Sequence, residues 1–145
     1  MNIQKTITRV FRKGIRSQLA NDIIELLSKE GFRPVFENDY LVFKIEGTTL
    51  FFTLDREDLH FTRLILPNFY EVTTNNKVLA LYNMNYLNSS YKFATLTMEN
   101  EIVSAFVDLA LYPESMEEVI PRMINIVMSI REIFNREMEK GYSCD

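Results

Sequence analysis

The fold class is decided by YKFATLTMENEIVSAFVDLAL, residues 91–111. Apolar and polar side chains alternate through Tyr91–Met98 and again through Ile102–Leu111, a pattern typical of strands with one buried face. A turn at Glu99-Asn100 predicts that the two strands form a hairpin. A long helix with an apolar stripe follows from Ser115. A hairpin that leads directly into a helix indicates a compact α+β domain.

Upstream of the hairpin, the chain opens with a second apolar stripe that predicts a helix from about residue 3 to Glu30. Gly14 is a weak point inside this helix, because glycine is a poor helix former. Ser17 could instead cap a shorter helix and leave the first 16 residues as a separate arm. Gly31 is well placed to end the helix in the left-handed conformation. The stripe consists of Ile3, Ile7, Val10, Phe11, Ile15, Leu19, Ile23, Leu26 and Leu27.

Four short strands are expected between this helix and the middle of the chain, with two-residue turns at Asn38-Asp39 and Gly47-Thr48 and a longer one at residues 56–58. Pro67 should close the last strand, because proline cannot donate a hydrogen bond to a sheet. The expected strands are Phe32–Glu37, Tyr40–Glu46, Thr49–Asp55 and Leu59–Leu66.

Two further helices complete the expected order. Thr73 or Thr74 could cap a helix over Asn75–Asn88, in which Asn83 and Asn85 are expected to bond to local backbone. The last helix should start with a capping box from Ser115 to Glu118. Pro121 then predicts a kink, or a helix start a few residues later.

The predicted fold is α+β, an antiparallel sheet with helices packed mainly on one face, in the order α-βββ(β)-α-ββ-α. The length of 145 residues fits a single domain, 1–145, in which residues 1–16 could form a basic amphipathic extension of the first helix. No apolar run approaches the roughly 20 residues needed to span a bilayer. Cys144 is the one cysteine, so an internal disulfide is impossible, and a cytoplasmic location is expected.

Charge is distributed unevenly along the chain. The opening 16 residues carry five bases and no acid, which leaves 11 bases and 20 acids elsewhere, a net charge of −9. The bases could be the solvated face of the first helix, docked on the chain's own acidic surface. They could instead form an arm that binds an anionic lipid, a nucleic acid or an acidic partner. The five bases are Lys5, Arg9, Arg12, Lys13 and Arg16.

The order of elements resembles the type III secretion chaperone-like fold, and in particular the YbjN-like (bacterial sensory transduction regulator) proteins. The resemblance runs from Glu30-Gly31-Phe32 to the end of the last helix. Its most similar part is Tyr82-Asn83-Met84-Asn85, leading through Ser90-Tyr91-Lys92-Phe93 into the hairpin Ala94–Leu111. The resemblance implies a cytoplasmic bacterial module that binds proteins, is often dimeric and has no catalytic site.

Catalytic chemistry finds little support in the sequence. His60 is the only histidine, and Cys144 lies in a terminal tail, where no fixed pocket would activate a thiol. Phosphate-binding glycine motifs do not occur, and Asp55, Glu57 and Asp58 lack the spacing of a calcium loop. We therefore expect no enzyme activity, no catalytic residue, no cofactor and no metal.

An aromatic cluster is the candidate functional surface. It lies where the second helix is expected to meet the hairpin, and it could serve a homodimer or another protein partner, or it could be ordinary core. Nucleic acid is not expected as a partner, because Phe11 is the one aromatic residue among the first 30. The cluster consists of Tyr82, Tyr86, Tyr91 and Phe93.

Overall fold

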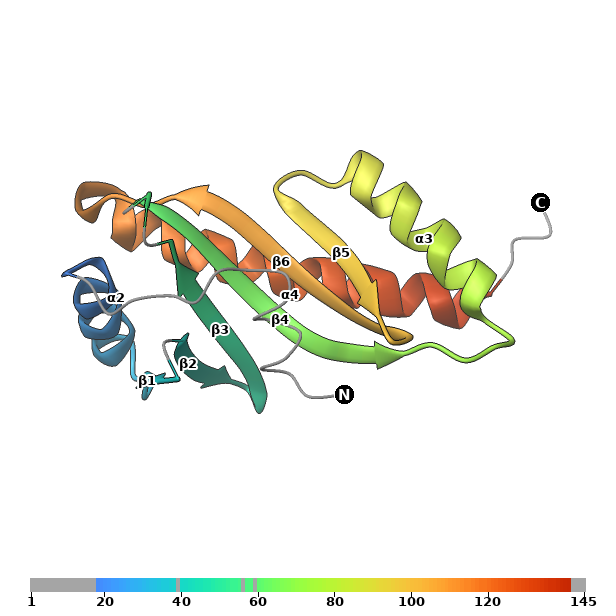
Figure 1. The fold of residues 1–145 in the computed structure, drawn as a ribbon, viewed down its shortest axis with the longest axis horizontal. Coiled ribbons are helices and arrows are strands. Elements are labelled where there is room, and N and C mark those ends of the chain that lie inside the picture. The colour runs from blue at the N-terminus through green and yellow to red at the C-terminus, as the bar shows by residue number, and fades with distance from the viewer. Residues whose placement is uncertain (1–17, 39, 56, 59, 142–145) are drawn as a thin grey trace.

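The structure is a computed structural model that describes residues 18–38, 40–55, 57–58 and 60–141. Figure 1 shows its helices and strands in chain order. They are α2 (Gln18–Lys29), β1 (Val35–Glu37), β2 (Tyr40–Ile45), β3 (Thr48–Leu54), β4 (Phe61–Glu71), α3 (Lys77–Ser90), β5 (Ala94–Glu99), β6 (Ile102–Ala110), a 3₁₀ turn (Pro113–Ser115) and α4 (Met116–Lys140).

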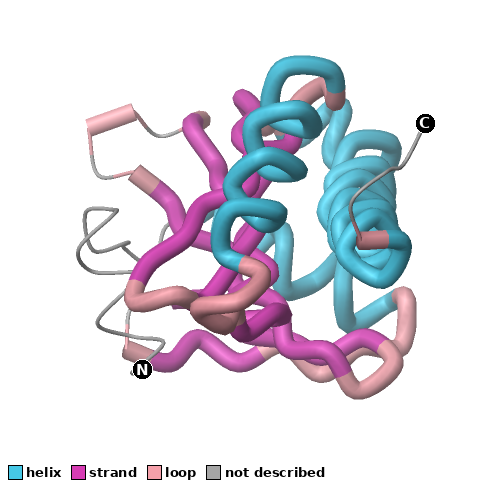
Figure 2. Tube along the Cα trace, turned by 90° about the vertical axis from the view of Figure 1, so that its right-hand side faces the viewer, coloured by secondary structure: helices cyan, strands magenta, loops and turns pink. Residues whose placement is uncertain are grey.

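The six strands form one antiparallel sheet in the order β1-β2-β3-β4-β6-β5. The helices lie together on one side of this sheet (Figure 2). Helix α4 packs against β4, β5 and β6, whereas α3 packs on α4 and along the edge strand β5. The predicted fold class, with its antiparallel sheet and its order of elements, is therefore confirmed.

The main core lies between the helices and the inner face of the sheet. It joins the stripe of α4 to the alternating residues of the strands, because side chains two positions apart share a sheet face. Its largest fully buried side chains are Phe43, Phe52, Phe134, Ile23, Leu27, Leu41, Leu50, Leu64, Leu66, Leu111, Ile120 and Met123.

Helix α2 ends as the sequence predicts. Gly31 has φ +92°, and its N–H donates to the carbonyl of Ser28 at 3.1 Å. The N–H of Phe32 donates to the carbonyl of Leu27 at 3.0 Å. This pair of bonds is a Schellman motif, which requires a residue in the left-handed region and so favours glycine. The part of the predicted first helix before Gln18 lies outside the described residues.

Two hairpin turns are shifted by one residue from their predicted positions. Ile45 pairs with Thr48, so the turn residues are Glu46 and Gly47, with φ of 49° and 80°. In the later hairpin, Glu99 pairs with Ile102, and the turn residues are Asn100 and Glu101, with φ of 50° and 63°. Two successive residues with positive φ match the right-handed twist of the strands, and this geometry selects the register.

Pro67 does not close β4, contrary to the prediction. The strand runs on to Glu71, because a β-bulge between Leu66 and Tyr70 removes the need for a proline N–H. Within the bulge, Asn68 has φ +50°, and its N–H donates to the Ser104 hydroxyl at 2.8 Å. The bulge thus lengthens the strand that α4 covers.

The helix starts also differ from the predictions. The N-cap of α3 is Asn76, and its side-chain oxygen accepts a bond from the N–H of Thr73, so neither threonine caps the helix. Helix α4 begins at Met116, and the N-cap Ser115 makes no side-chain capping bond. The Ser115 hydroxyl donates instead to the carbonyl of Tyr112. Pro121 lies inside α4, so the alternative prediction, that the helix starts a few residues after the capping box, is wrong.

Candidate functional site: an exposed apolar face of α3

Helix α3 is apolar on two opposite sides. One side packs on α4 and β5 and is buried, through Leu79, Ala80, Met84 and Leu87. A helix with a single packing partner normally presents polar residues to water on its other side. Here the other side carries large apolar residues alongside the exposed Asn85 and Ser89.

The exposed side defines what we call the α3 surface. Its residues recur at intervals of three and four along the helix, and one further aromatic residue follows the helix, just before β5. The members and their exposed fractions are Val78 69%, Leu81 48%, Tyr82 67%, Tyr86 60% and Phe93 58%.

Three of the four aromatic residues singled out from the sequence lie on the α3 surface, namely Tyr82, Tyr86 and Phe93. Tyr91 is half-buried and packs against the main core. The sequence analysis did not single out Val78 and Leu81, which are exposed as well. The signal that could have found them is that large apolar residues occur all round this helix.

The exposed apolar area of the α3 surface is large. Its three aromatic residues together expose roughly 370 Å², taking about 200 Å² for each whole side chain. The largest apolar patch on a typical monomer is about 300–600 Å² and is often functional. A standard interface covers about 800 Å² on each partner, so the α3 surface could form the centre of one.

The α3 surface is also nearly free of charge. Helix α3 contains no acidic residue, and its one basic residue is Lys77 at its first position. The rest of the chain beyond residue 16 carries a net charge of −9. An acidic partner would therefore meet less charge repulsion at this helix than the average surface of the chain would give.

Phe93 is held in an unfavourable backbone conformation, with φ +70°. A bulky residue in the left-handed region is rare, and the conformation costs about 1–2 kcal/mol. Most of the Phe93 side chain is nevertheless exposed, so the main core does not explain its presence. Strain of this kind is concentrated at functional sites.

We expect a Phe93→Gly variant to be more stable than a Phe93→Ala variant by about 1 kcal/mol, because only glycine relieves the positive φ. Both variants lack the ring, so the difference between their free energies of unfolding reports the cost of the positive φ. Urea unfolding followed by circular dichroism would measure it. Equal stabilities, or a more stable alanine variant, would show that Phe93 is not strained.

Asparagine side chains fix the position of α3. Asn88 donates from its Nδ2 atom to the carbonyl of Leu96 at 3.0 Å, and its Oδ1 atom accepts from the N–H of Leu96 at 2.7 Å. Asn83 is buried and points its amide at the sulfur of Met138, and Asn85 is exposed. The amide that bonds to backbone at this junction is therefore Asn88, rather than Asn83 or Asn85.

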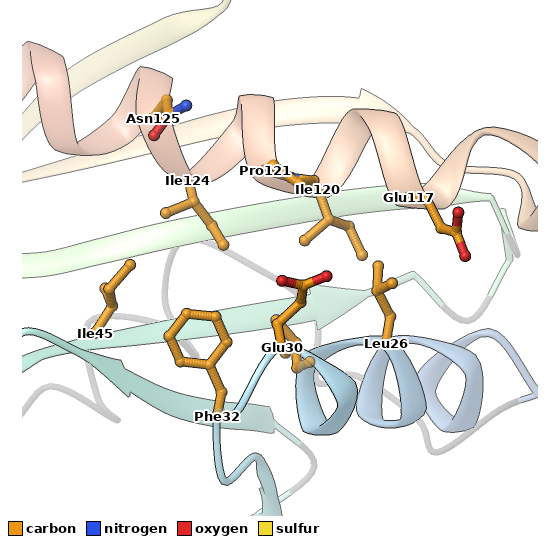
Figure 3. Close-up of a pocket in the computed structure, with 10 residues that line it drawn as sticks. Leu26, Glu30, Phe32, Ile45, Glu117, Ile120, Pro121, Ile124 and Asn125 are labelled. Atoms are coloured by element: carbon orange, nitrogen blue, oxygen red, sulfur yellow. The ribbon is translucent and has the colours of Figure 1, made fainter.

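A small apolar cavity of about 200 Å³ lies between α2 and α4. Leu26 faces Ile120, and Phe32 and Ile45 face Ile124, with the carboxylate of Glu30 among them (Figure 3). Ligand pockets usually measure about 300–1,000 Å³ and combine apolar walls with several converging polar groups. This cavity is smaller than that range, so its volume does not favour a ligand site.

The remaining polar candidates serve local structure. The Asp55 carboxylate accepts the N–H groups of Glu57 and Asp58, and the Asp58 carboxylate accepts those of His60 and Phe61. Within the described residues, no group of three His, Cys, Asp or Glu side chains could hold a metal ion. The described part of the chain also has no helix long and apolar enough to cross a membrane. Cys144 and the five bases Lys5, Arg9, Arg12, Lys13 and Arg16 lie outside it.

Comparison with known proteins identifies the fold and leaves the function open. No protein-family model matches the chain, and no curated protein matches it in sequence. Among solved structures, the chain is similar to YbjN from E. coli, described as a candidate transcription regulator. The TM-score is 0.64 at 10% sequence identity, over 82% of this chain and 93% of that chain. The expected YbjN-like fold is thereby confirmed.

Proposed function

We propose that the protein is a non-enzymatic protein–protein interaction module of the cytoplasm, chaperone-like or regulatory, and that it forms a homodimer through the α3 surface. The observation that carries the proposal is the exposed, uncharged apolar side of α3. Exposure of an aromatic patch of this size to water is unfavourable, so covering the patch with a partner lowers the free energy.

A second copy of the chain fits this surface because the surface can pair with itself. In a two-fold symmetric dimer the same residues meet from both sides. Suppose that two α3 helices pack antiparallel and that the two-fold symmetry axis passes beside Tyr82. Val78 of one copy then lies opposite Tyr86 of the other. A small side chain then faces a large one on each side of the axis, which favours close packing. Helix α3 has no acidic residue and a single base, Lys77, so few like charges would face each other across this contact.

The structural neighbour supports a regulatory form of this role. YbjN shares the fold over most of both chains, and it is described as a candidate transcription regulator. A regulator without a catalytic site acts through the partners that it binds. We therefore propose regulation through protein contacts, with the dimer as the working unit.

Site-directed cross-linking of the full chain tests the proposed dimer. In a Cys144→Ser background, an Asn85→Cys variant places one thiol beside Tyr82 and Tyr86 on the exposed side of α3. A short bismaleimide should join two chains through this position, whereas a Ser28→Cys variant, exposed on α2, should give no covalent dimer. Sedimentation of the unmodified protein measures its mass independently.

Each result bears on the proposal. A dimer by sedimentation with cross-linking at position 85 and none at position 28 supports the α3 surface. A dimer that cross-links at position 28 but not at position 85 uses another surface, and it refutes the proposed contact. A monomer at tens of micromolar refutes the homodimer, and the α3 surface would then require a different protein partner.

A further inference from the structure

The cavity between α2 and α4, which we call the α2–α4 cavity, has the size of a single large side chain. It holds about 200 Å³, and apolar residues form most of its wall. An apolar cavity of about 150 Å³ takes one benzene ring. The α2–α4 cavity is therefore too small for most ligands, but it is large enough for one aromatic or branched aliphatic side chain. Its apolar residues are Leu26, Leu27, Phe32, Ile45, Ile120, Pro121 and Ile124.

The charged groups of the α2–α4 cavity are both acidic. Glu30 and Glu117 lie in its wall and are exposed, and no described lysine or arginine lines it. Figure 3 shows the Glu30 carboxylate between α2 and α4, among the apolar side chains, and the Glu117 carboxylate at one end of the cavity. Within the described residues, neither carboxylate has a hydrogen bond or an ion pair. Two negative charges are thus available to a partner.

The position of Glu30 favours a bound cation. Glu30 directly follows Lys29, the last residue of α2, and the carboxyl end of a helix carries partial negative charge. A carboxylate is unfavourable at such an end, whereas a cation is favourable. A base bound beside Glu30 would therefore be stabilised by the carboxylate and by the helix end together.

The surroundings of the α2–α4 cavity are acidic as well. Glu114, Glu117 and Glu118 place three exposed carboxylates within five residues at the start of α4. An acidic segment would be repelled by these groups, and a neutral segment would remove water from them without pairing with them. A basic segment pairs with them instead, so charge complementarity indicates a basic partner.

We propose that the α2–α4 cavity is a second protein-binding site. It takes one large apolar side chain of another protein, from a segment that carries a lysine or arginine on each side of that residue. The apolar side chain is buried in the cavity, and the bases meet Glu30 and Glu117 at the surface. Apolar burial supplies the affinity, and the carboxylates select basic segments over acidic ones. No residue of α3 lines the cavity, so this site goes beyond the proposed dimer and does not depend on it.

Titration of the isotope-labelled full chain with short peptides, followed by NMR, tests this proposal. The probes are Lys-Phe-Lys, Lys-Ala-Lys and Glu-Phe-Glu, each acetylated and amidated at its ends. Lys-Phe-Lys should shift the signals of Ile45 and Ile124 in a saturable manner, because both residues line the cavity. Its affinity should be at least about tenfold higher than that of either other peptide. The signals of Tyr86 on the α3 surface should stay unchanged.

Removal of the two carboxylates tests the role of charge. A Glu30→Gln and Glu117→Gln double variant should bind Lys-Phe-Lys about threefold to tenfold more weakly, and added salt should then weaken binding less. The matched control replaces Glu132 and Glu139 with glutamine, since both are exposed on α4 outside the cavity wall. The control changes the net charge equally, and its affinity should stay within about twofold of the unmodified chain.

The opposite results would overturn the proposal. Equal affinities for Lys-Phe-Lys and Lys-Ala-Lys would show that the cavity takes no side chain. Equal affinities for Lys-Phe-Lys and Glu-Phe-Glu, or equal losses in the two double variants, would show that the carboxylates do not select the partner. If shifts are absent at millimolar peptide, or are confined to the α3 surface, the peptide does not bind in the cavity. Signals of Ile124 that change with the concentration of the chain alone would assign the cavity to a second copy.

Discussion

Replacing Phe134 with alanine should lower the free energy of unfolding by about 3–5 kcal/mol, a large part of the 5–15 kcal/mol typical of a domain. The Phe134 ring is fully buried and meets two rings from the extension of β4 edge-on. Its centroid lies 5.9 Å from that of Phe69 and 5.2 Å from that of Tyr70. Alanine would leave a cavity where the second half of α4 packs on the sheet.

The matched control is Phe134→Leu, which keeps most of the volume and should cost less than about 1.5 kcal/mol. The chain contains no tryptophan, so circular dichroism in urea is the suitable measurement, at one fixed protein concentration. A loss below 1 kcal/mol for the alanine variant would contradict the packing of α4 described above.

Tyr82→Glu should abolish the proposed dimer without unfolding the domain. An interface aromatic at the centre of a contact contributes about 2 kcal/mol or more. Two-fold symmetry applies each substitution twice, so the loss is about 4 kcal/mol, equivalent to a roughly thousandfold higher dissociation constant. The two new carboxylates would also repel each other near the axis.

The control for this variant is Tyr112→Glu, since Tyr112 is exposed beyond the end of β6 and stacks on His60. Sedimentation over a range of concentrations compares both variants with the unmodified chain. Dimers that persist in Tyr82→Glu, or that disappear equally in Tyr112→Glu, would argue against α3 as the contact.

The sequence predicts element types well, because periodicity records which face of each element is buried. Alternation in the hairpin and the stripe of α4 identified both elements and the order of the fold. Features set by backbone geometry were harder to predict. The turns moved by one residue, because residue types alone did not show that Glu46 and Glu101 adopt positive φ. The β4 bulge also depends on the Ser104 hydroxyl of another strand, which local rules cannot identify.

The candidate site was only partly predictable for a similar reason. The aromatic content of the helix–hairpin junction pointed to Tyr82, Tyr86 and Phe93, but a sequence does not say which side of a helix with apolar residues all round is covered. Tyr91 and Tyr86 look equivalent in the sequence, but in the fold Tyr91 is half-buried against the main core and Tyr86 is exposed. The strained backbone of Phe93 has no signal in the sequence.

The amide of Asn88 covers the middle of an exposed sheet edge. Alternate residues of an edge strand direct their backbone groups outward, and such groups invite another strand to add to the sheet. On β5, the outward pair at the middle of the strand belongs to Leu96, and Asn88 occupies both of its hydrogen-bonding groups. The opposite edge, β1, is only three residues long. A strand of another chain could therefore pair neither with the middle of β5 nor with a long stretch of β1, which disfavours growth of one continuous sheet from chain to chain.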